Sequence, residues 1–93
     1  MFTIQAIDGR ARAGTLHTAH GRLKTPFYMP VATKAAAKDM SPEEMEACGI
    51  RSIISNGLLI GLRPGADIIA KHGGIHAFMH WDKGVFTDSG GFQ

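Results

Sequence analysis

Alternating apolar and polar residues predict a strand at the amino terminus. Phe2, Ile4 and Ala6 alternate with Thr3, Gln5 and Ile7 ahead of Asp8-Gly9, a dipeptide that favours a tight hairpin. Residues 14–18 and 23–25 can form two more short strands, separated by His20-Gly21. Residues 1–25 are therefore expected to form a small antiparallel β meander.

After Pro26 the pattern changes to alternating strands and helices. The compact apolar run over residues 27–32 predicts a strand. Ser41-Pro42-Glu43-Glu44 then provides an N-cap, a first-turn proline and acidic residues that suit a helix start. This helix is expected over about residues 42–47, ending at Cys48-Gly49, where glycine can adopt the left-handed conformation.

The same alternation continues to the end of the chain. Residues 50–55, rich in β-branched side chains, predict a second buried strand, and Asn56-Gly57 predicts a loop after it. Residues 66–72 predict a helix that ends at Gly73-Gly74, with a further helical turn from His76 to His80. A third strand is expected over residues 84–87. This β-α-β-α-β order indicates an α/β fold with a parallel sheet.

A three-stranded parallel sheet cannot easily be covered on both of its faces. Exposed apolar faces or open strand edges are therefore expected. The chain has 93 residues, of which 44% are hydrophobic and 19% charged, a composition typical of one small globular domain. Its formal charge of +2 is too small to indicate nucleic-acid binding by itself.

The cysteine content and the apolar runs favour a cytoplasmic location. Cys48 is the sole cysteine, so it cannot form an internal disulfide, and it is interpreted as a buried structural thiol rather than a nucleophile. The sequence also lacks a signal-peptide pattern and an apolar run of the ~20 residues that span a bilayer.

The residues with the clearest chemical potential follow the third predicted strand. Asp88 can accept hydrogen bonds or carry a proton, Gly90 and Gly91 permit close approach of a ligand, and Phe92 can stack on a heteroaromatic ring. This position suits a ligand site, because α/β folds bind ligands at the carboxyl ends of their strands. The alternative interpretation is a strand-ending Asx turn with a core phenylalanine.

The segment Asp88-Ser89-Gly90-Gly91-Phe92-Gln93 resembles the base-recognition signature of the tRNA-guanine transglycosylases, the queuine tRNA-ribosyltransferase family. Four further segments resemble family segments in the same order and at similar separations: residues 25–33, 62–65, 73–76 and 78–82. The resemblance covers about residues 14–93. It implies the amino-terminal part of a TIM (β/α)8 barrel, with the meander of residues 1–25 preceding the first three barrel strands in residues 26–93.

The resemblance implies that guanine in tRNA is exchanged for a 7-deazaguanine base by double displacement. Asp88 matches the aspartate that recognises the incoming base and acts as proton acceptor and donor. The other residues implied to bind substrate are Ser89, Gly90 and Gly91 in the base-binding loop, Phe92 as the stacking aromatic, Gln93 as a pocket amide, and Asn56 near the ribose. Val31 and Ile54 are similar to apolar residues of the ribose pocket.

The family also has a nucleophilic aspartate far downstream and a zinc site beyond the barrel, and this chain contains neither. The isolated chain is therefore expected to be inactive and to need a carboxyl-terminal remainder or partner chain, and a homo-oligomer is possible for the family. Alternatives are an archaeosine-type enzyme segment, a non-catalytic fragment, or an unrelated small α/β binding module. Gly90-Gly91 favours the queuine type over the archaeosine type. Asn56-Gly57-Leu58-Leu59 departs from the Asn-Thr-Tyr-His usual in bacterial members.

Other candidate sites are weaker. His72, His76 and His80 recur every four residues, but Gly73-Gly74 interrupts that face, and the five histidines are interpreted as surface or capping residues rather than metal ligands. Lys34, Lys38, Arg63 and Lys71 could contact phosphates, although isolated basic residues are usually just solvated. The glycine loop lacks the lysine of a nucleotide-hydrolysing motif.

Overall fold

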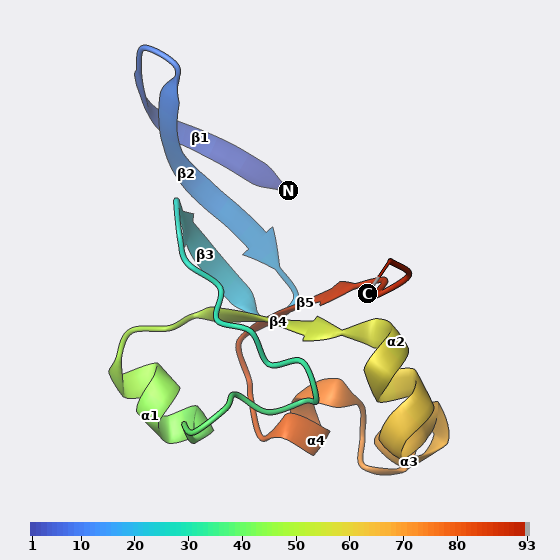
Figure 1. Cartoon of the computed structure of the whole chain (residues 1–93). Helices are drawn as coiled ribbons and strands as arrows, with labels where there is room; N and C mark the ends of the chain where they lie inside the picture. The colour runs from blue at the N-terminus through green and yellow to red at the C-terminus, as the bar shows by residue number, and fades with distance from the viewer. Residues whose placement is uncertain (93) are drawn as a thin grey trace.

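The computed structural model describes residues 1–92 and contains an antiparallel sheet and a parallel strand pair (Figure 1). The antiparallel sheet has the order β1-β2-β3, formed by Phe2–Asp8, Ala11–Thr18 and Gly21–Thr25. The parallel pair joins β4 (Ser52–Asn56) to β5 (Gly84–Asp88). The predicted meander and the last two predicted strands are therefore confirmed.

The helical segments lie between β3 and β5 in the sequence. They are α1 (Pro42–Ala47), α2 (Gly57–Ile60), η1 (Gly61–Gly65), α3 (Ala66–Lys71) and α4 (Ile75–Met79). In Figure 1, α1, α3 and α4 lie on the side of the parallel strands away from the β1–β2 hairpin, which projects from the rest of the chain. The parallel strands thus separate the hairpin from the helices.

The apolar run over residues 27–32 does not form the predicted strand. It makes a single parallel bridge, in which Val31 pairs with Ile54 of β4. Hydrogen bonds flank the bridge, from Ile54 N to Pro30 O (3.0 Å) and from Ala32 N to Ile54 O (2.7 Å). Pro26 and Pro30 lack an N–H, so the segment cannot supply the donors of a full ladder. It still lies beside β4 in parallel.

Helix α1 has the boundaries that the sequence predicts, because its N-terminus is capped twice. The Ser41 Oγ accepts a hydrogen bond from Glu44 N (3.1 Å), and the Glu44 carboxylate accepts one from Ser41 N (2.7 Å). This capping box satisfies two donors that would otherwise lack helical partners, and Pro42 needs no partner in the first turn. Met45 anchors the inner face of the helix in the core.

The prediction of a loop after β4 is wrong, because helix α2 begins at Gly57, directly after the strand. Asn56 is the N-cap of α2, and its Oδ1 accepts a hydrogen bond from Leu59 N at 2.9 Å. Asparagine is among the strongest N-cap residues, so the residue interpreted as a loop signal instead begins a helix. The helical path is then kinked in η1, where Arg63 has extended torsions and Pro64 follows.

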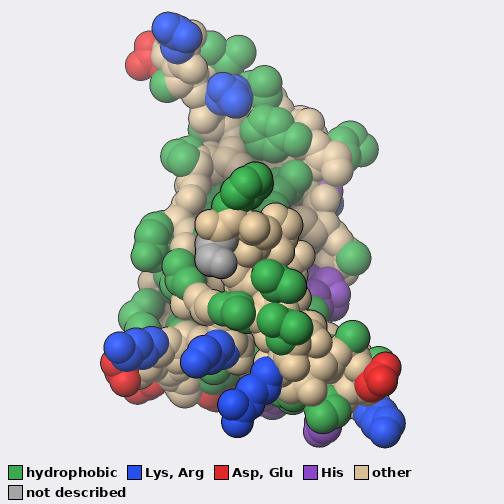
Figure 2. Space-filling view, turned by 45° about the vertical axis from the view of Figure 1, so that its right-hand side comes forward, with side chains coloured by type: hydrophobic (Ala, Val, Ile, Leu, Met, Phe, Trp, Pro, Cys, Tyr) green, Lys and Arg blue, Asp and Glu red, His purple; other side chains and the backbone are tan. Residues whose placement is uncertain are grey.

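The core is small and lies between the parallel strands and the helices. It contains Ala32, Ala35, Met45, Ile53, Ile60, Met79 and Trp81. Many large apolar side chains stay exposed instead, including Tyr28, Val31, Leu62 and Phe92. Figure 2 shows hydrophobic side chains spread over the face that is viewed, with Lys and Arg along its lower edge. The expected exposure of apolar surface is therefore confirmed.

Candidate functional site

The carboxyl ends of β4 and β5 bring two predicted site residues together. The parallel register pairs Ser52 with Gly84 at one end and Asn56 with Asp88 at the other. Asn56 is 3% exposed, whereas Asp88 is partly buried as the last residue of its strand. A carboxyl group and an amide thus stand side by side at the strand ends, where α/β folds bind their ligands.

The register also places four predicted site residues on one face of the parallel strands. Val31 pairs with Ile54 of β4. Asn56 lies two residues after Ile54 on β4, and Asp88 lies two residues after Phe86 on β5. Side chains two residues apart point to the same side of a strand. The opposite face carries Ile53 and Val85, which pack in or against the helical core. The site residues therefore lie on the face that these helices do not cover.

The site face carries an aromatic side chain on β5, two residues before the strand ends. Phe86 contacts Phe27 in a tilted arrangement, with 6.4 Å between ring centroids. Val31 is 62% exposed, and Ile54 is partly buried between its neighbours. The site face is thus apolar along the strands and polar at their ends.

The predicted base-binding loop turns sharply away from β5. Gly90 is buried and has a φ of 66°, a left-handed torsion that favours glycine. The Ser89 Oγ accepts a long hydrogen bond from Gly91 N at 3.4 Å. Phe92 is fully exposed, so its ring does not pack in the core as the alternative Asx-turn interpretation required. The predicted role of Gln93 lies outside the described residues.

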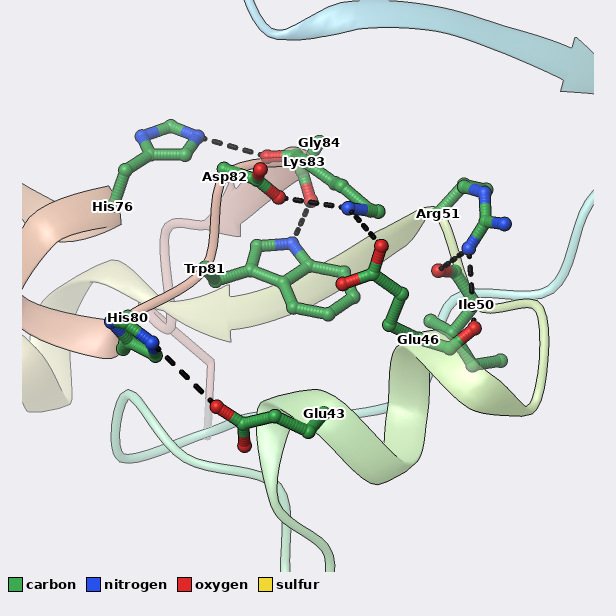
Figure 3. Close-up of polar contacts among 10 residues, drawn as sticks. All are labelled: Glu43, Glu46, Ile50, Arg51, His76, His80, Trp81, Asp82, Lys83 and Gly84. Carbon is green, nitrogen blue, oxygen red and sulfur yellow. Dashed lines mark hydrogen bonds and ion pairs between the residues drawn. The ribbon is translucent and has the colours of Figure 1, made fainter.

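The amino-terminal ends of the same strands hold an ion-pair network that the sequence analysis missed (Figure 3). The Lys83 ammonium lies 2.8 Å from the Asp82 carboxylate and 2.9 Å from that of Glu46. It also lies 5.7 Å from the ring centroid of Trp81, whose indole N–H donates to Gly84 O at 3.1 Å. The adjacent Trp81-Asp82-Lys83 was the sequence signal available, but the contribution of Glu46 depends on the fold.

The pKa shifts at this end agree with the contacts. The hydrogen bond from Lys83 lowers the pKa of Asp82, and the bonds to Asp82 and Glu46 raise the pKa of Lys83. Both groups are therefore stabilised in their charged forms. Because α/β folds bind their ligands at the carboxyl ends of their strands, we interpret this network at the opposite end as structural.

Two histidines join the antiparallel sheet to the helices. His20, in the turn between β2 and β3, stacks on His76 of α4 with 3.4 Å between centroids and an interplanar angle of 9°. A His76 ring nitrogen lies 3.0 Å from Lys83 O. Burial lowers the pKa of His76 below its usual 6.5, and the His20 ring lowers it further. Both rings line a hollow of about 370 Å³ with Trp81.

The remaining titratable candidates behave mostly as surface groups. His72 and His80 are exposed, and His80 ends α4 with left-handed torsions. Lys34, Lys38, Arg63 and Lys71 are exposed as well. Within residues 1–92, no group of three or more His, Cys, Asp or Glu side chains is arranged to hold a metal ion.

The prediction that Cys48 is a buried thiol is wrong, because the side chain is exposed. Cys48 is the C-cap of α1, and Met45 is the residue that carries this helix into the core. The turn at Gly49 (φ 85°) then leads the chain away from the helix, so the thiol is left on the surface.

Within residues 1–92, no helix is long and apolar enough to cross a membrane.

Comparison with known proteins identifies the family. The family model described as Queuine tRNA-ribosyltransferase matches residues 8–93. Curated proteins of that name are 57% identical over 83 residues in Geobacillus thermodenitrificans, 50% over 92 residues in Herpetosiphon aurantiacus and 49% over 92 residues in Nitrosomonas eutropha. These alignments cover 89%, 99% and 99% of this chain but only 22%, 24% and 26% of the relatives. The chain thus spans about a quarter of its relatives' length, and it belongs to the queuine tRNA-ribosyltransferase family.

Proposed function

We propose that this chain supplies the base-recognition part of a tRNA-guanine transglycosylase that replaces guanine in tRNA with a 7-deazaguanine base. The observation that carries the proposal is the register of β4 and β5, which sets Asp88 beside Asn56 at the carboxyl ends of parallel strands. Val31 and Ile54 lie on the same face, and a glycine turn follows Asp88. The reaction takes place on a cytoplasmic tRNA.

In the proposed double displacement, a carboxylate from a remainder or partner chain attacks C1′ of the target nucleotide. The C1′–N9 bond breaks, and the electron pair leaves with guanine. Asp88 protonates the departing base and later removes the corresponding proton from the incoming base, whose nitrogen displaces the carboxylate from C1′. Catalysis therefore needs two carboxylates, of which this chain provides one.

The remaining loop residues bind the base in this proposal. Gly90 and Gly91 let the backbone approach the flat ring, and Phe92, which is fully exposed, stacks on it. Ser89 and Gln93 offer a hydroxyl and an amide to the polar edge of the base. The apolar side chains of Val31 and Ile54 contact the ribose, and Asn56 lies near it.

We also propose that residues 26–93 form the first part of a (β/α)8 barrel. The segment around Val31, β4 and β5 lie side by side in chain order and in parallel, which is the arrangement of consecutive barrel strands. The exposed apolar residues would then contact the rest of the barrel. In this proposal the family's zinc site also lies in that remainder.

The test is the exchange of radiolabelled guanine into unmodified tRNA. The chain alone should show no exchange, whereas its mixture with the remaining residues of the Geobacillus thermodenitrificans relative should show it. Asp88→Ala should reduce the exchange by about 10²–10⁴-fold, the usual contribution of a general acid–base group. Asp67→Ala is the matched control, because Asp67 is exposed on α3, and it should leave the rate unchanged.

Exchange that survives Asp88→Ala would contradict the role of this residue. Absence of exchange in every mixture would favour the second candidate, a non-catalytic fragment that only assembles with a partner. In an active mixture, tRNA that carries labelled guanine is then incubated with queuine, with its precursor or with the archaeosine precursor. The base that releases the label separates the queuine type from the archaeosine type.

A further inference from the structure

The side chain of Asn56 lies directly against the turn that follows Asp88. A Cβ placed on Gly90 would lie 2.5 Å from Asn56 Oδ1 and 2.8 Å from Asn56 Nδ2. Real Cβ atoms do not come this close to other atoms, so the amide plane occupies the space that a side chain at residue 90 would need. Glycine at residue 90 therefore permits both the left-handed φ of the turn and the close contact with the Asn56 amide.

The position of the Asn56 amide is itself fixed by the fold. Its Oδ1 accepts the hydrogen bond from Leu59 N at 2.9 Å that caps α2. Its backbone pairs with Asp88 in the register of the parallel strands, and its N–H donates to Thr33 O at 3.4 Å. The same side chain thus contacts the start of α2 and the turn after β5.

A second close approach lies beside the first one. A Cβ on Gly57 would lie 3.0 Å from Asp88 O, so the start of α2 also lies tightly against the end of β5. Two glycines, one from each strand end, let the two turns interlock. The path of the chain from Asp88 to Gly91 therefore depends on the shape of the turn at Asn56.

We infer that Asn56 is a positioning residue that sets the conformation of the Asp88–Gly91 turn, rather than a group whose main contact is with the substrate. With 3% of its area exposed, Asn56 offers little surface to a ribose, whereas its amide plane covers Gly90. This inference rests on the proposed function for its catalytic meaning. The positioning itself is a property of the chain that can be measured without catalysis.

The first test compares amide spectra of the full 93-residue chain with those of Asn56→Ser. Serine retains an N-cap oxygen but removes the amide plane, so the Leu59 amide should stay protected from hydrogen exchange. The amide signals of Ser89, Gly90 and Gly91 should shift. Ser41→Ala, which removes a cap at α1, is the control and should leave these three signals in place. Unchanged loop signals in Asn56→Ser would overturn the inference.

A second variant keeps the test decisive if Asn56→Ser does not fold. Gly90→Ala introduces the methyl group against the amide and should shift the side-chain NH2 signals of Asn56. Unmoved NH2 signals would overturn the inference as well.

The functional arm measures binding of 7-deazaguanine to the chain and its variants. Gly90→Ala should weaken binding of the base. The factor by which it weakens binding should be at least about threefold smaller in the Asn56→Ser background than in the parent chain, because substitutions of contacting residues have non-additive effects. Equal losses in both backgrounds would argue against positioning. If the parent chain does not bind the base, the proposed function fails for the isolated chain, while the spectra still decide the role of Asn56.

Discussion

The two ends of the β4–β5 pair are built in opposite ways. At the amino-terminal end, Trp81, Lys83 and Glu46 hold the start of β5 with a hydrogen bond and ion pairs. At the carboxyl-terminal end, Asp88 is followed by a glycine turn and an exposed phenylalanine. Under the proposed function, the difference separates side chains that stabilise the fold from those that bind the base.

The largest expected difference between the ends is in the free energy of unfolding. Trp81 is 3% exposed in the core, so Trp81→Ala should lower this free energy by about 3–5 kcal/mol, or abolish cooperative unfolding. Phe92→Ala removes an aromatic ring that contacts solvent, and it should change stability by less than about 0.5 kcal/mol. Urea unfolding followed by circular dichroism measures both, and equal losses would contradict the comparison.

The ion pairs of Lys83 should contribute much less than the indole. Lys83→Met keeps most of the stem and removes the charge, and it should lower the free energy of unfolding far less than Trp81→Ala, because Asp82 and Glu46 are largely exposed. The loss should shrink in high salt, where exposed charges are screened. A loss that does not depend on salt would show that packing, rather than charge, holds the start of β5.

The smallest expected effect is the pH dependence that His76 brings. Because its pKa in the folded chain lies below 6.5, the unfolded chain binds the proton more readily. Stability should therefore be fully present above about pH 6.5 and decrease as the pH falls toward the pKa of the folded state. Urea midpoints between pH 5 and 8 measure this trend, and His76→Gln should flatten it. A rise in stability on acidification would contradict the sign.

Local chemistry explains why parts of the fold could be predicted. The capping box at Ser41 and Glu44 gave helix α1 its limits, and Asp8-Gly9 gave the first hairpin. The predictions were wrong around Pro30 and at Asn56, because proline and asparagine each occur in more than one kind of local structure. Prolines reduced a predicted strand to one bridge, and an asparagine predicted to open a loop instead capped a helix.

The sequence named the candidate site residues but did not predict how they are arranged. The residue types alone singled out Asp88, Gly90 and Gly91, and the family resemblance added Asn56. The register of the parallel strands set Asn56 beside Asp88, and the fold brought its amide against Gly90. Such contacts join residues more than thirty positions apart, so local patterns cannot reveal them.

By itself, the sequence determined the family of the chain, the positions of β4 and β5 along it and the caps of its first helix, because these depend on local motifs of residue types. The tertiary structure alone decided which strand end is held by Lys83 and Trp81, which end carries the open loop, and that Cys48 lies on the surface. Burial and pairing depend on which distant segments share a face, and that is fixed only when the parallel strands align and the helices pack on one side.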